Sequence, residues 1–123
     1  EKSRIARELE RNEEDKVKTI TERVRLGEKV YARNCAACHQ LNGQGIPPAF
    51  PSLTTRQFIE RKKSEHISIV VDGRRGSAMQ PFRKQLSEEE IAAVITYTLN
   101  SWGNSSSTKT KVVTMQDVLT HLE

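Results

Sequence analysis

The sequence predicts a small all-α domain whose long loops wrap around a bound group. Three observations lead to this prediction. Apolar residues recur at steps of three and four in several segments, and no segment shows a convincing strand-like alternation. The longest loops are rich in glycine and proline, which favours stiff, irregular backbone. Hydrophobic residues make up only 35% and aromatic residues 5% of the 123 residues, and a small domain of this kind often needs a metal, a disulfide or a cofactor to complete its core.

The first helix is expected over residues 20–36. Thr19 and Glu22 have the spacing of a capping box, in which each side chain closes a backbone donor of the other. One face of this helix, at steps of three and four, carries Val24, Gly27, Tyr31 and Cys35. Residues 1–18, which precede it, are rich in charge and are interpreted as a lead-in or linker.

Two shorter helices are expected in the middle of the chain. One covers residues 55–62, and the other begins at a Ser64 cap and ends at Gly73 in the left-handed conformation. The second helix should turn inward Ile67, Val70 and Val71. Residues 40–53 hold two of the six glycines and three of the four prolines, so they are interpreted as a loop, as are residues 76–85.

The last predicted helix opens at a second capping box. Ser87 and Glu90 form the box, and the helix runs to about Trp102. Its apolar face carries Ile91, Val94, Ile95 and Thr98. The organised domain is therefore expected to span residues 19–104, with residues 105–123 as a polar C-terminal tail that carries a small apolar patch.

Residues 35–39 read CAACH, the C-x-x-C-H pattern through which c-type haem is attached. Two thiols three positions apart at the end of a helix can add across the two vinyl groups on one edge of a porphyrin. The adjacent His39 is then held beneath the iron. Both cysteines, Cys35 and Cys38, fall inside the motif, so none remains for a structural disulfide. The motif predicts one covalent haem c with His39 as an axial ligand.

Two other chemistries use the same residue types. A structural zinc site would need a fourth ligand beyond Cys35, Cys38 and His39, and adjacent Cys and His residues give poor tetrahedral geometry. A thioredoxin-type redox pair belongs at a βαβ turn, which this sequence lacks. Haem is the interpretation that the motif and its context favour.

Met79 is the candidate second axial ligand. A haem with one ligand leaves an open site, which electron carriers commonly close with a thioether. Met79 lies in a loop between two predicted helices, 40 residues after His39, whereas Met115 lies beyond the last helix and is interpreted as a core filler. His66 is interpreted as a surface or satisfied histidine, and His121, near the terminus, would coordinate only adventitiously.

The stretch from Gly27 to Asn104 resembles class I cytochromes c, with Gly27 and Tyr31 on the first helix and Tyr97 on the last. In that family two helices cross closely at such a glycine, with an aromatic ring beside it. The likeness to one member group is more specific in three segments: GEKVY, CAACHQLNGQGIPPAFPSL and LSEEEIAAVITYTLNSWGN. Together they resemble the cytochrome c domain fused to subunit II of bacterial caa-type cytochrome c oxidases. The chain has no second cysteine pair and no cupredoxin pattern, so the copper domain of such a subunit is not part of this sequence.

The resemblance implies further roles. Pro48 (or Pro47) would offer a backbone carbonyl to His39, and Tyr97 and Trp102 would pack near the haem. Residues 114–118 would match the end of the parent subunit. The implied function is one-electron transfer from a donor protein to the dinuclear copper centre of a terminal oxidase. The alternatives are a free-standing electron-carrier cytochrome and an open-site haem enzyme or gas sensor, for which no distal His/Arg pair is evident.

The charge of the chain agrees with a protein partner. The formal net charge is +4, the two propionates of a haem would reduce it, and no nucleic-acid motif accompanies it. Four basic residues flank the Met79 loop, and they are interpreted either as a docking rim for an acidic partner or as an ordinary solvated face: Arg74, Arg75, Arg83 and Lys84. No apolar run is long enough to insert into a membrane. Because haem c is attached outside the cytoplasm, the expected location is the periplasm or the outer face of the cytoplasmic membrane.

Overall fold

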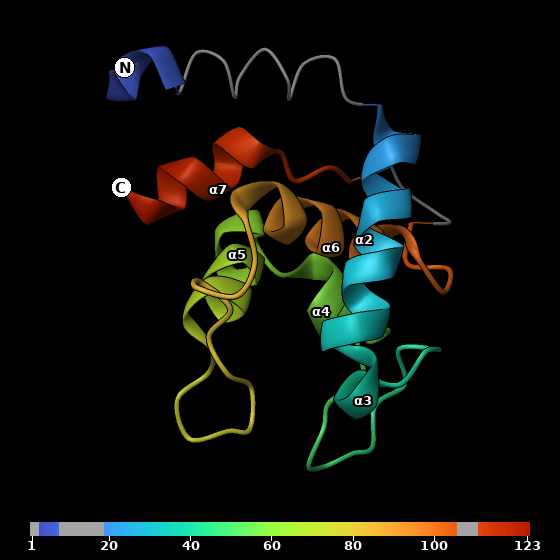
Figure 1. Ribbon diagram of the computed structural model, residues 1–123. Helices are drawn as coiled ribbons and strands as arrows, with labels where there is room; N and C mark the ends of the chain where they lie inside the picture. The colour runs from blue at the N-terminus through green and yellow to red at the C-terminus, as the bar shows by residue number, and fades with distance from the viewer. Residues whose placement is uncertain (1–2, 8–18, 106–110) are drawn as a thin grey trace.

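A computed structural model describes residues 3–7, 19–105 and 111–123 of the chain (Figure 1). Its helices are α2 (Ile20–Asn34), α3 (Ala36–His39), α4 (Arg56–Glu60), α5 (Lys63–Asp72), α6 (Glu88–Asn100) and α7 (Met115–Leu122). Residues 4–7 also form a helical turn. The described residues contain no strand, only one isolated bridge between Ile46 and Phe50. The predicted all-α class is confirmed, while most of the predicted lead-in lies outside the described residues.

The crossing of α2 and α6 forms the centre of the fold. The two helices contact each other more extensively than any other pair, and α5 and α7 pack against α6 (Figure 1). Gly27 lies at the crossing, where an added Cβ would overlap the Ala93 carbonyl oxygen and lie 2.6 Å from Tyr97 Cβ. Only a residue without a side chain permits this approach. The helices enclose a core of buried side chains that includes Val30, Tyr31, Ile91, Ile95 and Leu99.

The sequence predicted some of the helix caps correctly and one of them incorrectly. Ser87 and Glu90 form the expected reciprocal capping box at the start of α6. Thr19 accepts a hydrogen bond from the Glu22 backbone N–H, as predicted. The predicted Ser64 cap is wrong, because α5 begins at Lys63. Arg61 and Lys62 have extended backbones that turn the chain directly from α4 into α5, so Ser64 lies inside the first turn. Gly73 ends α5 with φ 75°, as expected.

Two of the predicted helices extended too far at their C-terminal ends. The first helix ends at Asn34, and Cys35 separates it from the short helix α3 that carries the rest of the cysteine motif. The last long helix ends at Asn100, and Trp102 has φ 55°, in the left-handed region. Cys35 and Trp102 therefore lie in bends of the chain, where their side chains leave the faces of the helices.

The segment from Lys111 to the C-terminus packs against the core and is not a loose polar tail. Thr114 and Asp117 form a capping box at the start of α7, and Val113 and Val118 are completely buried. The Thr96 hydroxyl accepts a hydrogen bond from the Val113 N–H at 3.0 Å, which fixes the segment to α6. The prediction of a tail over residues 105–123 missed this because the intervening residues are polar.

The loop after the cysteine motif is fixed to α6 by one buried amide. Asn104 is 5% exposed. Its Nδ2 donates to the Leu53 carbonyl oxygen at 2.9 Å and to the Thr98 carbonyl oxygen at 2.7 Å. The Leu53 N–H in turn donates to the Gly43 carbonyl oxygen at 2.7 Å. Asn104 thus links the two ends of the 43–53 loop to the C-terminal turn of α6.

Replacing Gly27 by alanine should destabilise the folded protein. The new methyl group would force α2 and α6 apart, and overpacking of this kind costs about 1–3 kcal/mol. Urea unfolding of the protein measures the change. Glu28→Ala, at the next and exposed position of α2, should change the free energy of unfolding by less than about 0.5 kcal/mol. Equal stabilities for the two variants would contradict a close crossing at Gly27.

Asn104→Ala should cost about 1–3 kcal/mol, because it leaves the Leu53 and Thr98 carbonyl oxygens without their side-chain donor in a buried environment. The same urea titration measures the loss. Gln44→Ala serves as the control, since Gln44 lies in the same loop but is exposed. An Asn104→Ala variant as stable as the Gln44→Ala variant would show that the amide does not hold the loop.

Candidate functional site

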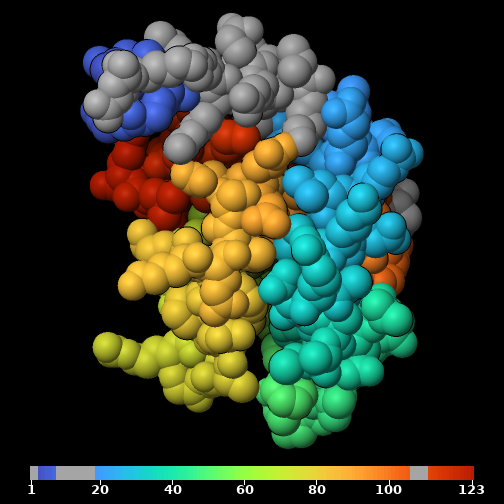
Figure 2. Space-filling view, in the orientation of Figure 1, coloured from blue at the N-terminus to red at the C-terminus, as the bar shows by residue number. Residues whose placement is uncertain are grey.

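A large cavity lies between α2, α4, α5 and α6. Its volume is about 470 Å³, within the range of roughly 300–1,000 Å³ typical of cofactor sites. Figure 2 shows the surface hollowed between the chain that follows α5 and the chain that carries α3 and the 40–53 loop. The wall formed by α6 is mostly apolar and consists of Val94, Ile95 and Thr98. The cavity can therefore enclose a large flat group while leaving one edge near solvent.

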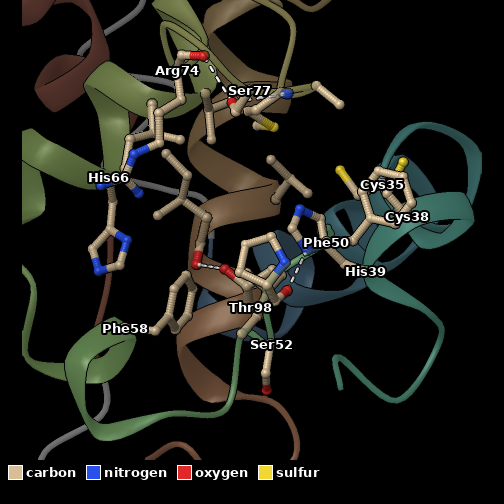
Figure 3. A pocket seen from close by; sticks show the side chains of 18 of the residues that line it. Cys35, Cys38, His39, Phe50, Ser52, Phe58, His66, Arg74, Ser77 and Thr98 are labelled. Atoms are coloured by element: carbon tan, nitrogen blue, oxygen red, sulfur yellow. Dashed lines mark hydrogen bonds between the residues drawn. The ribbon is translucent and has the colours of Figure 1, made fainter. Parts of the chain in front are cut away.

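Cys35, Cys38 and His39 line one side of this cavity (Figure 3). Cys35 follows the last turn of α2, and its N–H still donates to the Tyr31 carbonyl oxygen at 2.9 Å. The His39 N–H donates to the Cys35 carbonyl oxygen at 3.0 Å, so α3 is a single turn that brings the three side chains to one place. Both thiols are free and half-buried. This arrangement fits attachment of a porphyrin by two thioether bonds.

Burial raises the pKa of the Cys35 thiol to about 11, and the neighbouring Cys38 contributes to the rise. Redox-active thiols instead have a lowered pKa, since the thiolate is their reactive form. In the described part of the chain, no group of three or more His, Cys, Asp or Glu side chains is arranged to hold a metal ion. The raised pKa counts against the thioredoxin-type interpretation of the motif, and the lack of such a group among the described residues counts against the zinc interpretation.

The backbone of the 40–53 loop orients His39. Its Nδ1 lies 2.9 Å from the Pro51 carbonyl oxygen, and because a carbonyl can only accept, this nitrogen carries the proton. The lone pair of the imidazole is therefore on Nε2, as an iron ligand requires. The expectation that Pro48 or Pro47 supplies this carbonyl is wrong.

The Ile46–Phe50 bridge explains this difference. Each of these two residues donates its N–H to the carbonyl oxygen of the other, at 2.8 and 2.9 Å. The residues between them therefore form the tip of a tight turn, where Pro47 and Pro48 are exposed and do not line the cavity. Pro51 is the first proline after the turn, where the chain comes back to the cavity wall.

Met79 lines the same cavity as His39, from the segment that follows α5. This segment returns along α5, where the Phe82 N–H donates to the Val70 carbonyl oxygen at 2.9 Å. The Met79 carbonyl oxygen accepts from the Arg74 N–H at 3.1 Å, and a Cβ on Gly73 would lie 2.8 Å from that oxygen. Gly73 therefore permits both the positive φ and the close return of the chain. The half-buried Met79 is held at the cavity while Met115 is buried elsewhere in the core.

Tyr97 and Trp102 do not line the cavity, although both were expected next to the haem. They pack with Tyr31 as an aromatic cluster, in which the three ring-centroid distances are 5.3, 5.5 and 5.7 Å. Tyr31 is the member that reaches the cavity wall. Burial raises its pKa above the usual range, and its hydroxyl donates to the Gln40 carbonyl oxygen. The cluster thus supports the wall behind the cysteine motif and does not contact the cavity beyond Tyr31.

His66 is the residue that the sequence analysis misjudged most. It is 4% exposed and lines the cavity, where a surface or satisfied histidine was expected. It precedes Val70 by one helical turn, so it lies on the same face of α5 as the residues that were expected to turn inward. His121 lies elsewhere, with its Nε2 3.0 Å from Asp72 Oδ2.

Several known proteins have sequences similar to this chain. Residues 22–97 match the family described as cytochrome C oxidase, cbb3-type, subunit III. Cytochrome c-552 of Thermus thermophilus is 34% identical over 96 residues, which cover 68% of this chain and 72% of that protein. Cytochrome c6 of Diacronema lutheri is 30% identical over 78 residues, 63% of this chain and 94% of that protein.

Larger proteins contain a similar segment. The cytochrome c subunit of the quinone alcohol dehydrogenase of Gluconobacter oxydans (strain 621H) is 29% identical over 90 residues, which are 65% of this chain and 19% of that subunit. In the described part of this chain, no helix is both long and apolar enough to cross a membrane. The cavity, the cysteine motif and the relatives of this chain thus agree on a helical electron-transfer domain with haem c as the cofactor. The chain belongs to the cytochrome c family described as cytochrome C oxidase, cbb3-type, subunit III.

Proposed function

We propose that this chain carries one haem c bound through thioethers of Cys35 and Cys38, with His39 and Met79 as the axial ligands of the iron. The observation that carries the proposal is that all four side chains line one cavity. The hydrogen bond from His39 Nδ1 to the Pro51 carbonyl oxygen adds support, since it leaves Nε2 directed away from the loop backbone.

The residues of the chain have separate roles in this site. The haem supplies the one-electron chemistry, and the protein sets its potential through the ligands and the burial. Phe82, Val94 and Ile95 are 4%, 3% and 2% exposed, so they exclude water from the cavity. Tyr31 closes the wall behind Cys35. A Met79 thioether on the iron raises the reduction potential relative to a second histidine.

Met79→Ala should abolish the weak far-red absorption band that a Met sulfur–ferric iron bond gives. Removal of the thioether leaves the sixth position open. Met115→Leu is the matched control, because the chain has two methionines and Met115 is buried in the core at 6% exposure, outside the cavity lining. The absorption spectrum of the purified ferric protein measures both variants.

The opposite pattern would overturn the assignment of Met79. A native protein that lacks the band and binds carbon monoxide readily when reduced has an open sixth site. That result would favour the open-site enzyme or gas sensor over an electron carrier.

We also propose that the domain passes electrons from a donor protein to the dinuclear copper centre of a terminal oxidase. The resemblance of three segments to the cytochrome c domain of oxidase subunit II supports this partner. The match to a family named after an oxidase subunit supports only the coarser statement that the acceptor is a terminal oxidase. A free-standing periplasmic carrier is the second candidate, favoured by the likeness to cytochrome c-552 and cytochrome c6. Both candidates place the domain outside the cytoplasm, where haem c is attached.

The docking rim consists of Arg74, Arg75, Arg83 and Lys84, all of which are exposed. These residues belong to the segment that covers the Met79 side of the cavity, and Arg83 also pairs with Asp72 at 2.7 Å. Positive charge beside the site that exchanges electrons would attract an acidic partner and increase the rate of encounter.

The double variant Arg75→Gln/Lys84→Gln should slow electron transfer to the soluble copper domain of an oxidase subunit II by roughly two- to tenfold at low salt, since rim charges act mainly on the association rate. Stopped-flow measurement of the bimolecular rate tests this. Arg25→Gln/Lys29→Gln, on the exposed face of α2, removes the same charge and should have a smaller effect. A native rate that does not fall when ionic strength is raised would rule out steering.

A further inference from the structure

His66 is a buried histidine with an unused ring nitrogen at the cavity. The residue is 4% exposed, and its Nε2 has no hydrogen-bond partner among the described residues. A buried polar atom without a partner costs free energy, so native structures rarely keep one without a reason. The ring packs edge-on against Phe58, with 4.8 Å between the ring centroids. This contact fixes the position of the ring within the cavity wall.

The hydrogen bonding of the ring determines what the free nitrogen can do. The ring also has a hydrogen bond with the backbone of Phe58, which favours the protonated ring. Because Nε2 has no partner in the described part of the chain, we infer that Nδ1 makes this hydrogen bond. A backbone carbonyl in this role accepts the Nδ1 proton. Neutral His66 therefore offers a lone pair at Nε2, and protonated His66 offers an N–H there. A suitable partner for Nε2 must donate a hydrogen bond to the neutral ring and accept one from the protonated ring. A group that can itself bind or release one proton meets both requirements.

The attachment of the haem specifies which of its groups would meet His66. In haem the two vinyl groups and the two propionates lie on opposite edges of the macrocycle. Figure 3 shows Cys35 and Cys38 on one side of the cavity, and His66 and Phe58 across it. A porphyrin bound at the cysteines by its vinyl edge would therefore direct its carboxylates toward the side where His66 lies.

The charges around His66 suit a carboxylate. Arg61 lines the cavity from the end of α4, with its guanidinium carbon 6.0 Å from the centroid of the Phe58 ring. Burial lowers the pKa of His66 to about 4, and the positive charges of Arg61 and Lys111 add to this shift. The α6 wall adds only uncharged side chains to the cavity. Without an anion the ring is neutral near pH 7, and a carboxylate beside it would favour protonation.

We propose that His66 Nε2 is the hydrogen-bond partner of a haem carboxylate and that the two groups hold one proton between them. The carboxylate satisfies the unused nitrogen, and the histidine satisfies a charge that would otherwise be costly to bury. This inference rests only on the attached haem and not on the choice of redox partner.

The shared proton links the reduction of the site to pH. Each electron added removes one unit of positive charge near His66, so the pair binds its proton more tightly in the reduced protein. One electron from the donor and one proton from the solvent are taken up together where the pair titrates. The reduction potential therefore falls as the pH rises through this range.

Three variants and two measurements test the proposal. The holoprotein is prepared with ¹³C in the carboxyl carbons of the haem, and redox-induced infrared difference spectra identify the bands of these groups. His66→Leu should shift a labelled carboxyl band and flatten the dependence of the potential on pH. His66→Gln can still form the hydrogen bond but cannot titrate, so it should keep the band near its native position and lose the pH dependence. His121→Gln, which alters a histidine outside the cavity lining, should leave both readouts unchanged.

Two results would overturn the proposal. Labelled bands and a pH dependence that are the same in the native and His66→Leu proteins would mean that His66 has no carboxylate partner. A far-red ferric band that is absent in the native protein and appears in His66→Leu would mean that His66 binds the iron. If His66→Leu does not retain haem, His66→Gln decides alone, because an unchanged pH dependence in that variant contradicts a shared proton.

Discussion

The close crossing of α2 and α6 at Gly27 is the constraint on which the rest of the structure depends. The crossing fixes the position of the C-terminal end of α2 relative to α6. It therefore also fixes the position of the attachment motif, which Cys35 and the single turn of α3 carry. It also exposes the Val94–Thr98 face of α6 to the cavity as its floor. Neither helix contains a candidate iron ligand, yet their relative position sets the distance that the ligand-bearing loops must span.

Two loops then complete the site, and each is fixed by hydrogen bonds to backbone carbonyl oxygens. The 40–53 loop is fastened by Asn104 and presents the Pro51 carbonyl oxygen to His39. The segment after α5 returns along Val70 and Val71, whose carbonyl oxygens accept from the Phe82 and Arg83 N–H groups. The return of the second segment uses only backbone groups and so depends little on side-chain identity, whereas the first loop depends on the Asn104 amide. This explains how a domain with 35% hydrophobic residues can keep a large cavity open to a cofactor.

Local signals in the sequence predicted what depends on short-range chemistry. The Ser87 capping box, the Gly73 helix end and the cysteine motif each require only residues within one turn of each other, and all three are present as expected. The choice of Pro51 over Pro48 depends on the Ile46–Phe50 bridge, which a proline-rich composition does not reveal. The packing of α7 depends on Thr96, which lies far away in the sequence and looks like any other polar helical residue.

His66 illustrates a different limit for the site. The inward face of α5 was predicted correctly, and His66 lies on it, one helical turn before Val70. The polar residue type, and not the helix phase, led to its assignment to the surface, because histidine is less often fully buried than the aliphatic residues around it. The cavity consequently combines an apolar floor, which favours a high reduction potential, with Arg61 and His66 at the opposite end from the cysteines, where the charge of the cofactor can be balanced.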